Sequence, residues 1–342
     1  MKRVIVCGFG FMGQNHAANI FLHPDLELAA VVDSRPKDKI QPVKGNIATA
    51  QLDWNRLSDI PFYTTLTEVL EQCSADAVLI ASPTAFHVPL ALEAIEHGKH
   101  VFVEKPLCFS LEEAASVQSA LKGKDLVFQV GHCVRFQSEY KILGEAVREN
   151  RYGKLKFLNL VRMTGTPNWG VWKDLQISLT ATAGPLFDLN IHDIDYALSL
   201  AGEPDNITVQ RRPESDTLFR SAWRYRNGTV VQIEGGFLKP STLPFRSGYT
   251  AVFEHAVMEY DSRFGSRIML SDETGSSEVS TATDRSSYYD ELAEFASALE
   301  TGSPVQCNAD EAVRTIRGCW QLASLFNGEK SVAQENLRGP ND

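Results

Sequence analysis

The chain has 342 residues, of which 43% are hydrophobic and 22% charged, and its net charge is −10 at pH 7. These proportions are ordinary for a globular protein, and the length predicts two domains because single cores rarely grow beyond about 250 residues. An acidic chain without a basic cluster repels phosphate backbones and anionic lipids, which excludes nucleic acid and membrane surfaces as expected partners.

The cysteines and the N-terminus indicate an intracellular protein. The six cysteines are scattered without the close spacing of zinc sites or redox dithiols, so we expect reduced thiols. The apolar stretch after Lys2 and Arg3 is soon cut by glycines, unlike a signal peptide, and no other run approaches the roughly 20 apolar residues that span a bilayer. We therefore expect a cytoplasmic protein.

The first third of the chain alternates short apolar runs with helical patterns, which is typical of a doubly wound parallel sheet of the Rossmann type. The predicted strands are 3–7, 28–33, 77–81, 100–103 and 126–130. The predicted helices are 11–22, 66–72, 89–97 and 111–121, the last capped by Ser110. Residues 33–60 give no clear pattern.

Strands dominate the later part of the chain. Predicted helices are 139–149, 185–201, 289–299 and 309–326, and predicted strands are 156–163, 221–226, 229–237, 250–260 and 267–270. Asn227 and Gly228 predict a two-residue type I′ turn between two of these strands. The sequence thus predicts a Rossmann domain at 1–131 and an α+β domain with a largely antiparallel open sheet at 132–342.

A glycine-rich segment follows the first predicted strand and opens the first helix. Its spacing fits the dinucleotide fingerprint, in which glycines allow the turn, the approach of a pyrophosphate and the packing of helix on strand. The expected cofactor contacts in it are Gly8, Phe9, Gly10, Phe11, Met12 and Gly13. The phosphates then meet the helix N-terminus.

Asp33 ends the second predicted strand, where a carboxylate accepts hydrogen bonds from the adenosine ribose. Its charge repels a 2′-phosphate, so NAD is the expected cofactor. Ser34 and Arg35 follow directly, and both are able to bind a phosphate, which leaves NADP open.

Lys105 stands between Glu104 and Pro106, directly after the apolar run 101–103. Parallel strands present their carboxyl ends to the ligand crevice of an open α/β sheet. We therefore expect Lys105 to face a bound cofactor, with Glu104 helping to fix its direction.

The helix predicted at 185–201 places Asp188 and His192 four residues apart on one face, so that both side chains point into the same cleft. Histidine is mostly neutral at cytoplasmic pH and suits the base that removes a hydroxyl proton. Asp188 would orient the imidazole, and Lys105 would stabilise the developing alkoxide. A solvated surface pair is the alternative interpretation. Adding Asp195 gives a metal-like spacing, but no His or Cys cluster supports it, so no metal is expected.

The fingerprint, the segment GKHVFVEKPL at 98–107 and the segment DLNIHDID at 188–195 together resemble the Gfo/Idh/MocA family of oxidoreductases along essentially the whole chain. The resemblance implies that Lys105 contacts cofactor and substrate, and that Asp188 and His192 complete the catalytic set. The segment SPTAFH resembles the family's cofactor-side loop, which adds Ser82, Pro83, Thr84 and His87 to the cofactor site. Asn190 departs from the family pattern, where glycine is frequent.

Two further residues are candidates for substrate binding. Arg135 either contacts a substrate or ties the domains together, and Trp172 either stacks on a sugar ring or packs in a core. The expected function is an NAD(P)-dependent dehydrogenase acting on a sugar, cyclitol or polyol hydroxyl. The alternatives are NAD-using glycoside cleavage or elimination, and a non-catalytic nucleotide-bound sugar sensor. The second sheet also offers a surface for a homodimer or homotetramer.

Overall fold

The computed structural model describes residues 1–43, 49–167, 184–211 and 218–326. They form two compact units. The first comprises Met1–Gln137 and Thr283–Val313, and the second comprises Ser138–Ala282 and the segment that starts at Arg314. The division after residue 137 and the return of Thr283–Val313 to the first unit differ from the single boundary predicted after residue 131.

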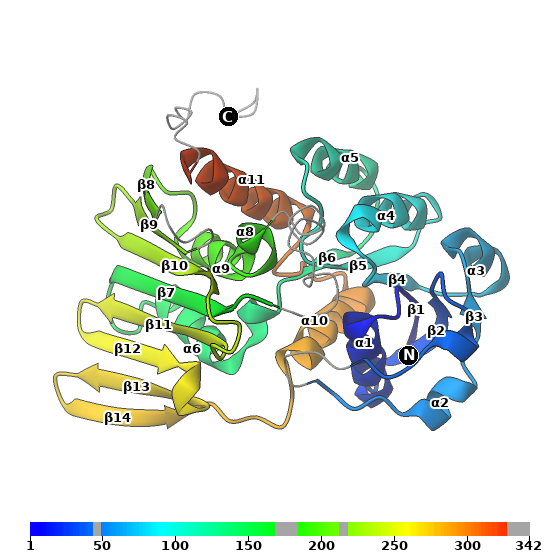
Figure 1. Ribbon diagram of the computed structural model, residues 1–342, viewed down its shortest axis with the longest axis horizontal. Coiled ribbons are helices and arrows are strands. Elements are labelled where there is room, and N and C mark those ends of the chain that lie inside the picture. The colour runs from blue at the N-terminus through cyan, green and yellow to red at the C-terminus, as the bar shows by residue number, and fades with distance from the viewer. Residues whose placement is uncertain (44–48, 168–183, 212–217, 327–342) are drawn as a thin grey trace. The chain divides into compact units, whose positions relative to one another are not determined.

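The first unit is built on a six-stranded parallel sheet (Figure 1). Five of its six strands contain no exposed residue, and the sixth contains only Glu27, which is the pattern of a sheet covered on both faces. The strands lie in the order β3 (Phe62–Tyr63), β2 (Leu26–Val32), β1 (Lys2–Cys7), β4 (Ala77–Ile80), β5 (His100–Glu104) and β6 (Phe128–Gly131). The Rossmann prediction is confirmed, because the order reverses at β1.

Helices surround this sheet. They are α1 (Phe11–Leu22), α2 (Trp54–Ser58), α3 (Leu66–Gln72), α4 (His87–Glu96), α5 (Leu111–Leu121) and α10 (Ser287–Thr301), and α10 packs against α1. The Ser110 hydroxyl accepts the backbone N–H groups of Glu112 and Glu113, as predicted. In the unassigned stretch, Asp53 caps α2 in the same way.

The second unit is built on an eight-stranded sheet in which only β7 and β10 pair in parallel. The order is β14 (Gly275–Ser280), β13 (Arg267–Asp272), β12 (Ala256–Asp261), β11 (Arg246–Phe253), β7 (Leu155–Gly165), β10 (Val230–Leu238), β9 (Phe219–Arg224) and β8 (Asn206–Arg211). Its helices include α6 (Ser138–Arg148), α8 (Pro185–Asp188) and α9 (Ile191–Ala201), and α11 (Ala309–Phe326) closes the described chain. The largely antiparallel sheet is confirmed.

Three local predictions are wrong. The single helix at 185–201 is two helices, α8 and α9, separated at Leu189 and Asn190. The single strand at 250–260 is the hairpin of β11 and β12, because the chain reverses at Glu254 and His255. The sequence analysis also missed β8 and β14, whose few apolar residues gave a weak signal.

The third wrong prediction is the type I′ turn between β9 and β10. Gly228 has a φ of 87°, but Asn227 does not have the positive φ that a type I′ turn requires. Instead, the Gly228 N–H donates to the Tyr225 carbonyl, and the Asn227 side chain accepts the Thr229 N–H. The hairpin therefore closes through a longer loop with glycine in the left-handed position.

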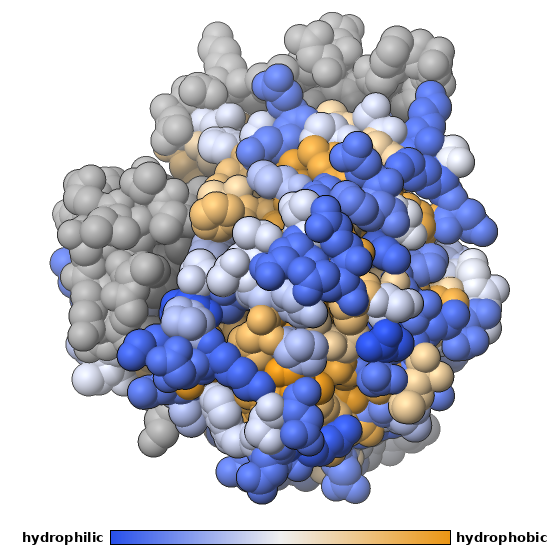
Figure 2. Space-filling view, turned by 90° about the vertical axis from the view of Figure 1, so that its right-hand side faces the viewer, coloured by the Kyte–Doolittle hydropathy of each residue, from blue (hydrophilic) through white to orange (hydrophobic). Residues whose placement is uncertain are grey.

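Polar residues cover much of the face in Figure 2, with apolar patches between them. No helix in the described part of the chain is long and apolar enough to cross a bilayer. Both Lys105–Pro106 and Lys239–Pro240 are cis peptide bonds.

Candidate active site

The loop after β1 has the form of a pyrophosphate cradle. Gly8 has a φ of 87°, and a Cβ there would lie 2.6 Å from the Ser82 backbone. A Cβ on Gly13 would lie 1.9 Å from the Gly8 carbonyl oxygen, whereas a Cβ on Gly10 would meet nothing within 4 Å. Gly8 and Gly13 thus permit close packing, and Gly10 leaves open space for a ligand.

The helix that follows leaves its N-terminus available to an anion. α1 begins after Gly10, and no side chain caps it. Phe11 and Met12, half-buried in the first turn, bring their backbone N–H groups to this end. The Phe9 side chain is fully buried and its ring packs edge-on against Phe62, so the predicted contact of Phe9 with the cofactor would be made by its backbone.

Asp33 lies beside the same loop at the end of β2. Its Oδ2 accepts the Phe9 backbone N–H at 2.8 Å, which ties the glycine loop to the second strand. Arg35 donates to Asp33 Oδ1 through Nε at 2.8 Å and to Oδ2 through Nη2 at 2.9 Å. Burial raises the pKa of Asp33, but the hydrogen bonds from Arg35 and Phe9 outweigh it, so the pKa lies below its usual range. Asp33 is therefore an anion at neutral pH.

The loop after β4 is held by a buried histidine. His87, 1% exposed, places Nδ1 2.9 Å from the Pro106 carbonyl oxygen and Nε2 2.8 Å from that of Ser82. Burial lowers the pKa of His87. Since both ring nitrogens face backbone carbonyls, His87 joins the ends of β4 and β5. In the same segment Pro83 is exposed and Thr84 is half-buried.

Lys105 follows β5 directly, at the carboxyl edge of the sheet, and its side chain is half-buried. Glu104 faces inward. Its Oε1 lies 2.6 Å from His16 Nε2, and its Oε2 accepts the Lys105 backbone N–H at 3.2 Å. Glu104 is therefore placed to fix the backbone of Lys105 rather than to reach a ligand through its carboxylate.

The other predicted catalytic residues lie in the second unit. Asp188 is the last residue of α8, and His192 is the second residue of α9; both are half-buried. The argument from one continuous helical face therefore does not apply as predicted, since the helix breaks between them.

Asn190 occupies this break. Its Nδ2 donates to the Arg162 backbone carbonyl of β7 at 3.1 Å, and Arg162 Nε bonds Asp193 Oδ2 at 2.9 Å. A Cβ on Gly235 of β10 would lie 2.1 Å from Asn190 Nδ2, so only glycine leaves room there for the Asn190 amide against the sheet. Asn190, 0% exposed, thus fixes α8 and α9 on β7 and β10.

Of the two further residues predicted to bind substrate, Arg135 and Trp172, the structure describes only Arg135. Arg135 is buried, and its guanidinium donates to the Gln306 carbonyl at 2.6 Å and pairs with Glu311 at 3.1 Å, all within the first unit. Contact of Arg135 with a substrate stays a prediction. Trp172 lies outside the described residues.

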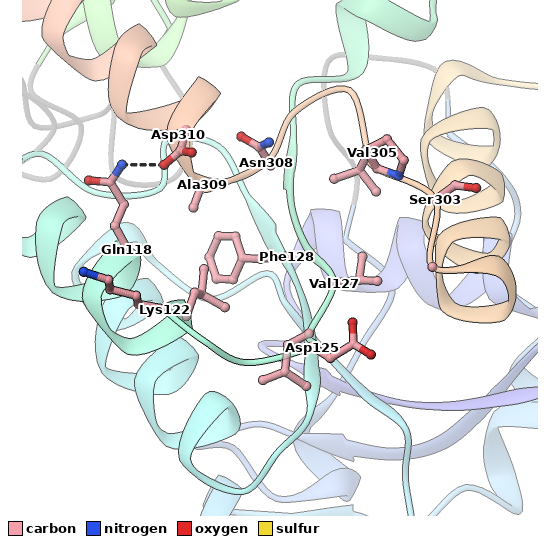
Figure 3. Close-up of a pocket in the computed structure, with 14 residues that line it drawn as sticks. Gln118, Lys122, Asp125, Val127, Phe128, Ser303, Val305, Asn308, Ala309 and Asp310 are labelled. Carbon is pink, nitrogen blue, oxygen red and sulfur yellow. Dashed lines mark hydrogen bonds between the residues drawn. The ribbon is translucent and has the colours of Figure 1, made fainter. Parts of the chain in front are cut away.

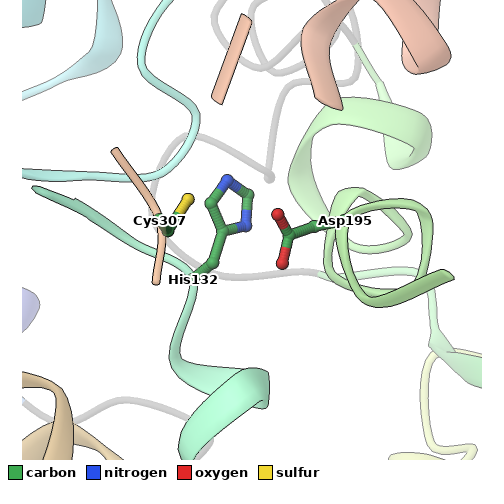
Figure 4. A group of neighbouring side chains, drawn as sticks. All are labelled: His132, Asp195 and Cys307. Carbon is green, nitrogen blue, oxygen red and sulfur yellow. The ribbon is translucent and has the colours of Figure 1, made fainter. Parts of the chain in front are cut away.

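Figure 4 shows the His132 ring beside the Cys307 thiol in the first unit. Two such donors are fewer than the three or four that a protein zinc site supplies. Asp195, also drawn there, belongs to the second unit, where its Oδ1 accepts the Thr315 hydroxyl at 3.0 Å.

The first unit also contains a cavity of about 420 Å³ between the C-terminal half of α5, the residues before β6 and the segment 302–310 (Figure 3). Gln118 donates to Asp310 across its rim. Because the cavity lies at the amino end of β6, it is separate from the carboxyl edge where the glycine loop and Lys105 lie.

Comparison with known proteins agrees with this geometry. Residues 2–132 match the model of the oxidoreductase family with an NAD-binding Rossmann fold, and residues 140–256 match the GFO/IDH/MocA C-terminal domain. The chain belongs to the Gfo/Idh/MocA oxidoreductase family. Its first unit is the family's NAD-binding domain, and the Gly10 opening and the uncapped α1 fit that cofactor.

Members of this family with assigned names resemble the chain at modest identity. The myo-inositol 2-dehydrogenase of Thermotoga maritima is 25% identical over 98% of this chain and 100% of its own length. The NAD-dependent scyllo-inositol 2-dehydrogenase of Bacillus subtilis is 32% identical over 58% of this chain and 54% of its own. An oxidoreductase from Agrobacterium radiobacter, solved with NAD⁺, L-tartaric acid and magnesium, has the same fold, with a TM-score of 0.76 at 15% identity over 96% of this chain and 97% of its own.

Proposed function

We propose that the chain is an NAD-dependent dehydrogenase that oxidises a secondary hydroxyl carbon of a sugar, cyclitol or polyol. The observation that carries this proposal is the glycine loop, in which Gly8 and Gly13 are sterically required, Gly10 is open, and Asp33 stands ionised beside it. The inositol dehydrogenases among the relatives support the substrate class.

The roles of the catalytic residues follow from the chemistry of alcohol oxidation. NAD bound at the glycine loop would supply the acceptor for the hydride that leaves the substrate carbon. His192 takes the hydroxyl proton, Asp188 orients its imidazole and stabilises the charged form, and Lys105 stabilises the negative charge that develops on the oxygen. Lys105 belongs to the first unit, whereas Asp188 and His192 belong to the second, so the proposed reaction needs both.

NAD is preferred over NADP in this proposal. The Asp33 carboxylate accepts the ribose hydroxyls and repels a 2′-phosphate. Arg35 does not readily attract a 2′-phosphate instead, because its guanidinium already donates hydrogen bonds to both oxygens of Asp33.

A screen of inositols, sugars and glycosides for NADH formation tests the function. We expect net NADH in proportion to the oxidised product. Product without net NADH would instead indicate glycoside cleavage or elimination with NAD as a transient oxidant. NAD binding with no product from any compound would favour a sugar sensor.

We also propose that the second sheet mediates self-association into a homodimer or homotetramer. Its outward side carries half-buried apolar residues that are paired across four neighbouring strands, Val230, Phe157, Val252 and Val257. Such a row is suited to a subunit interface. Light scattering at micromolar concentration tests this, and the mass of a single chain would contradict it.

A further inference from the structure

Three ionisable side chains meet inside the first unit, from elements far apart in the sequence. His16 comes from α1, Glu104 from β5 and Glu291 from α10, and they are 0%, 7% and 0% exposed. One nitrogen or oxygen atom from each lies within 4.8 Å of those of the other two. The proposed catalysis uses none of these side chains directly.

The first two members form a hydrogen-bonded pair. His16 Nε2 lies 2.6 Å from Glu104 Oε1, and Glu104 Oε2 accepts the Lys105 backbone N–H at 3.2 Å. Burial raises the pKa of Glu104, but the hydrogen bond and charge of His16 and the charge of Lys105 lower it further than burial raises it. Glu104 is therefore the anion of the cluster.

Glu291 has the opposite surroundings. Neither of its carboxyl oxygens has a hydrogen-bond partner among the described residues. Burial raises its pKa well above the usual range, and the negative charges of Glu104 and Glu294 raise it further. A second buried anion beside Glu104 would be costly, whereas a protonated carboxyl has an acceptor close at hand.

A metal ion is a poor occupant for this arrangement. Two ligands of one tetrahedral zinc, each about 2.0–2.1 Å from the ion, stand about 3.3 Å apart. His16 Nε2 and Glu104 Oε1 are only 2.6 Å apart, which is the length of a charge-assisted hydrogen bond. The geometry of the cluster therefore fits hydrogen bonds between its members and not a bound metal ion.

We propose that Glu291 is a buried carboxylic acid at neutral pH that donates a hydrogen bond to the Glu104 carboxylate, and that it is a positioning residue for Lys105. Through Glu104 Oε2 it fixes the peptide that carries Lys105. The protonation rests on the first unit alone, whereas the effect on Lys105 rests on the proposed function.

Other titratable groups surround the cluster without changing this assignment. A positive charge on His87 of α4 lowers the pKa of Glu104, but burial lowers the pKa of His87 itself. On α10, burial raises the pKa of both Tyr288 and Glu294 above their usual ranges. Cys133 of the short helix η3 (Cys133–Phe136) also raises the pKa of Tyr288. None of these groups is a cation beside Glu291, and the charge of His16 is paired with Glu104 at 2.6 Å, so the neutral form of Glu291 is retained.

Infrared spectroscopy of the full chain tests the protonation. At neutral pH we expect a carbonyl band of a protonated carboxylic acid that disappears in Glu291→Gln and persists in Glu300→Gln, an exposed control on the same helix. A spectrum in which Glu291→Gln removes only a carboxylate band would overturn the proposal. So would a stoichiometric bound metal that is lost in this variant.

Stability against pH gives a second readout. A group whose pKa is raised in the folded protein stabilises it fully below the unfolded pKa, and that contribution is lost as pH rises through the folded value. The melting temperature of the wild type should therefore fall relative to that of Glu291→Gln as pH rises above 4.5, the usual pKa of a glutamate carboxyl. A constant difference across this range would contradict a raised pKa.

Turnover tests the positioning role. Glu291→Gln keeps a donor of the same shape and should retain turnover within a few-fold, whereas Glu291→Leu removes the donor and should lower kcat about 10-fold. NAD affinity should be unchanged in both, since the glycine loop is untouched. Wild-type kcat in Glu291→Leu would refute the positioning role. If the wild type oxidises no compound, the proposed function fails while the infrared result still decides the protonation.

Discussion

At the scale of a single residue, Asp33 anchors the glycine loop of the first unit. One oxygen ties down the glycine loop through Phe9, and both oxygens bind Arg35. These bonds hold the carboxyl ionised in spite of its burial. We propose that the same charge that anchors the loop also selects against a 2′-phosphate.

Asp33→Asn should weaken NAD binding about 10-fold and narrow the preference for NAD over NADP, because a charge-assisted hydrogen bond is worth about 1.5–3 kcal/mol. Titration of NAD and NADP by calorimetry measures both effects. Asp38→Asn, at an exposed position after the same strand, is the matched control. Unchanged selectivity in Asp33→Asn would remove Asp33 from the cofactor site.

Sequence motifs and contact geometry differ in what they reveal about single residues. The close packing at Gly8 and Gly13 and the place of Asp33 after β2 were predictable because they depend on local chain order and spacing. The pairing of His16 with Glu104 and Glu291 was not, because these residues lie in three segments that only the folded sheet brings together. The sequence placed His87 shortly after β4, but its contacts with two backbone carbonyls required coordinates, and its contact with the cofactor stays a prediction.

At the scale of elements, the break between α8 and α9 shows where periodicity misleads. Phe187, Ile191, Ile194 and Leu198 keep the spacing of one helical stripe, and all four are buried. The interruption comes instead from Asn190, whose amide bonds a carbonyl of β7. A tertiary contact of this kind leaves no periodic signal, so the sequence predicted one helix.

Asn190→Ala should lower the unfolding free energy by about 1–3 kcal/mol, because it leaves the buried Arg162 carbonyl without this donor. Asn190→Asp should be more destabilising, since it adds a carboxylate beside Asp193, whose pKa burial already raises. Thermal melting of the two variants and the wild type measures the order. Equal melting temperatures for all three would show that the contact does not fix the break.

At the scale of the whole molecule, the chain divides the proposed chemistry between its two units. The first holds the cofactor loop and Lys105, and the second holds Asp188 and His192. The return of Thr283–Val313 to the first unit brings Glu291 to the cofactor domain. The sequence predicted both sheets from their strand patterns, but not this return, because α10 reads as an ordinary amphipathic helix.

The most direct test of this account is the turnover of Lys105→Ala and His192→Ala on a substrate found in the screen, with His97→Ala as a surface control. We predict that each of the first two lowers kcat by about 10²–10⁴-fold, while NAD affinity stays within a few-fold of the wild type and His97→Ala is unaffected. Wild-type kcat in both Lys105→Ala and His192→Ala would contradict the proposed catalytic set.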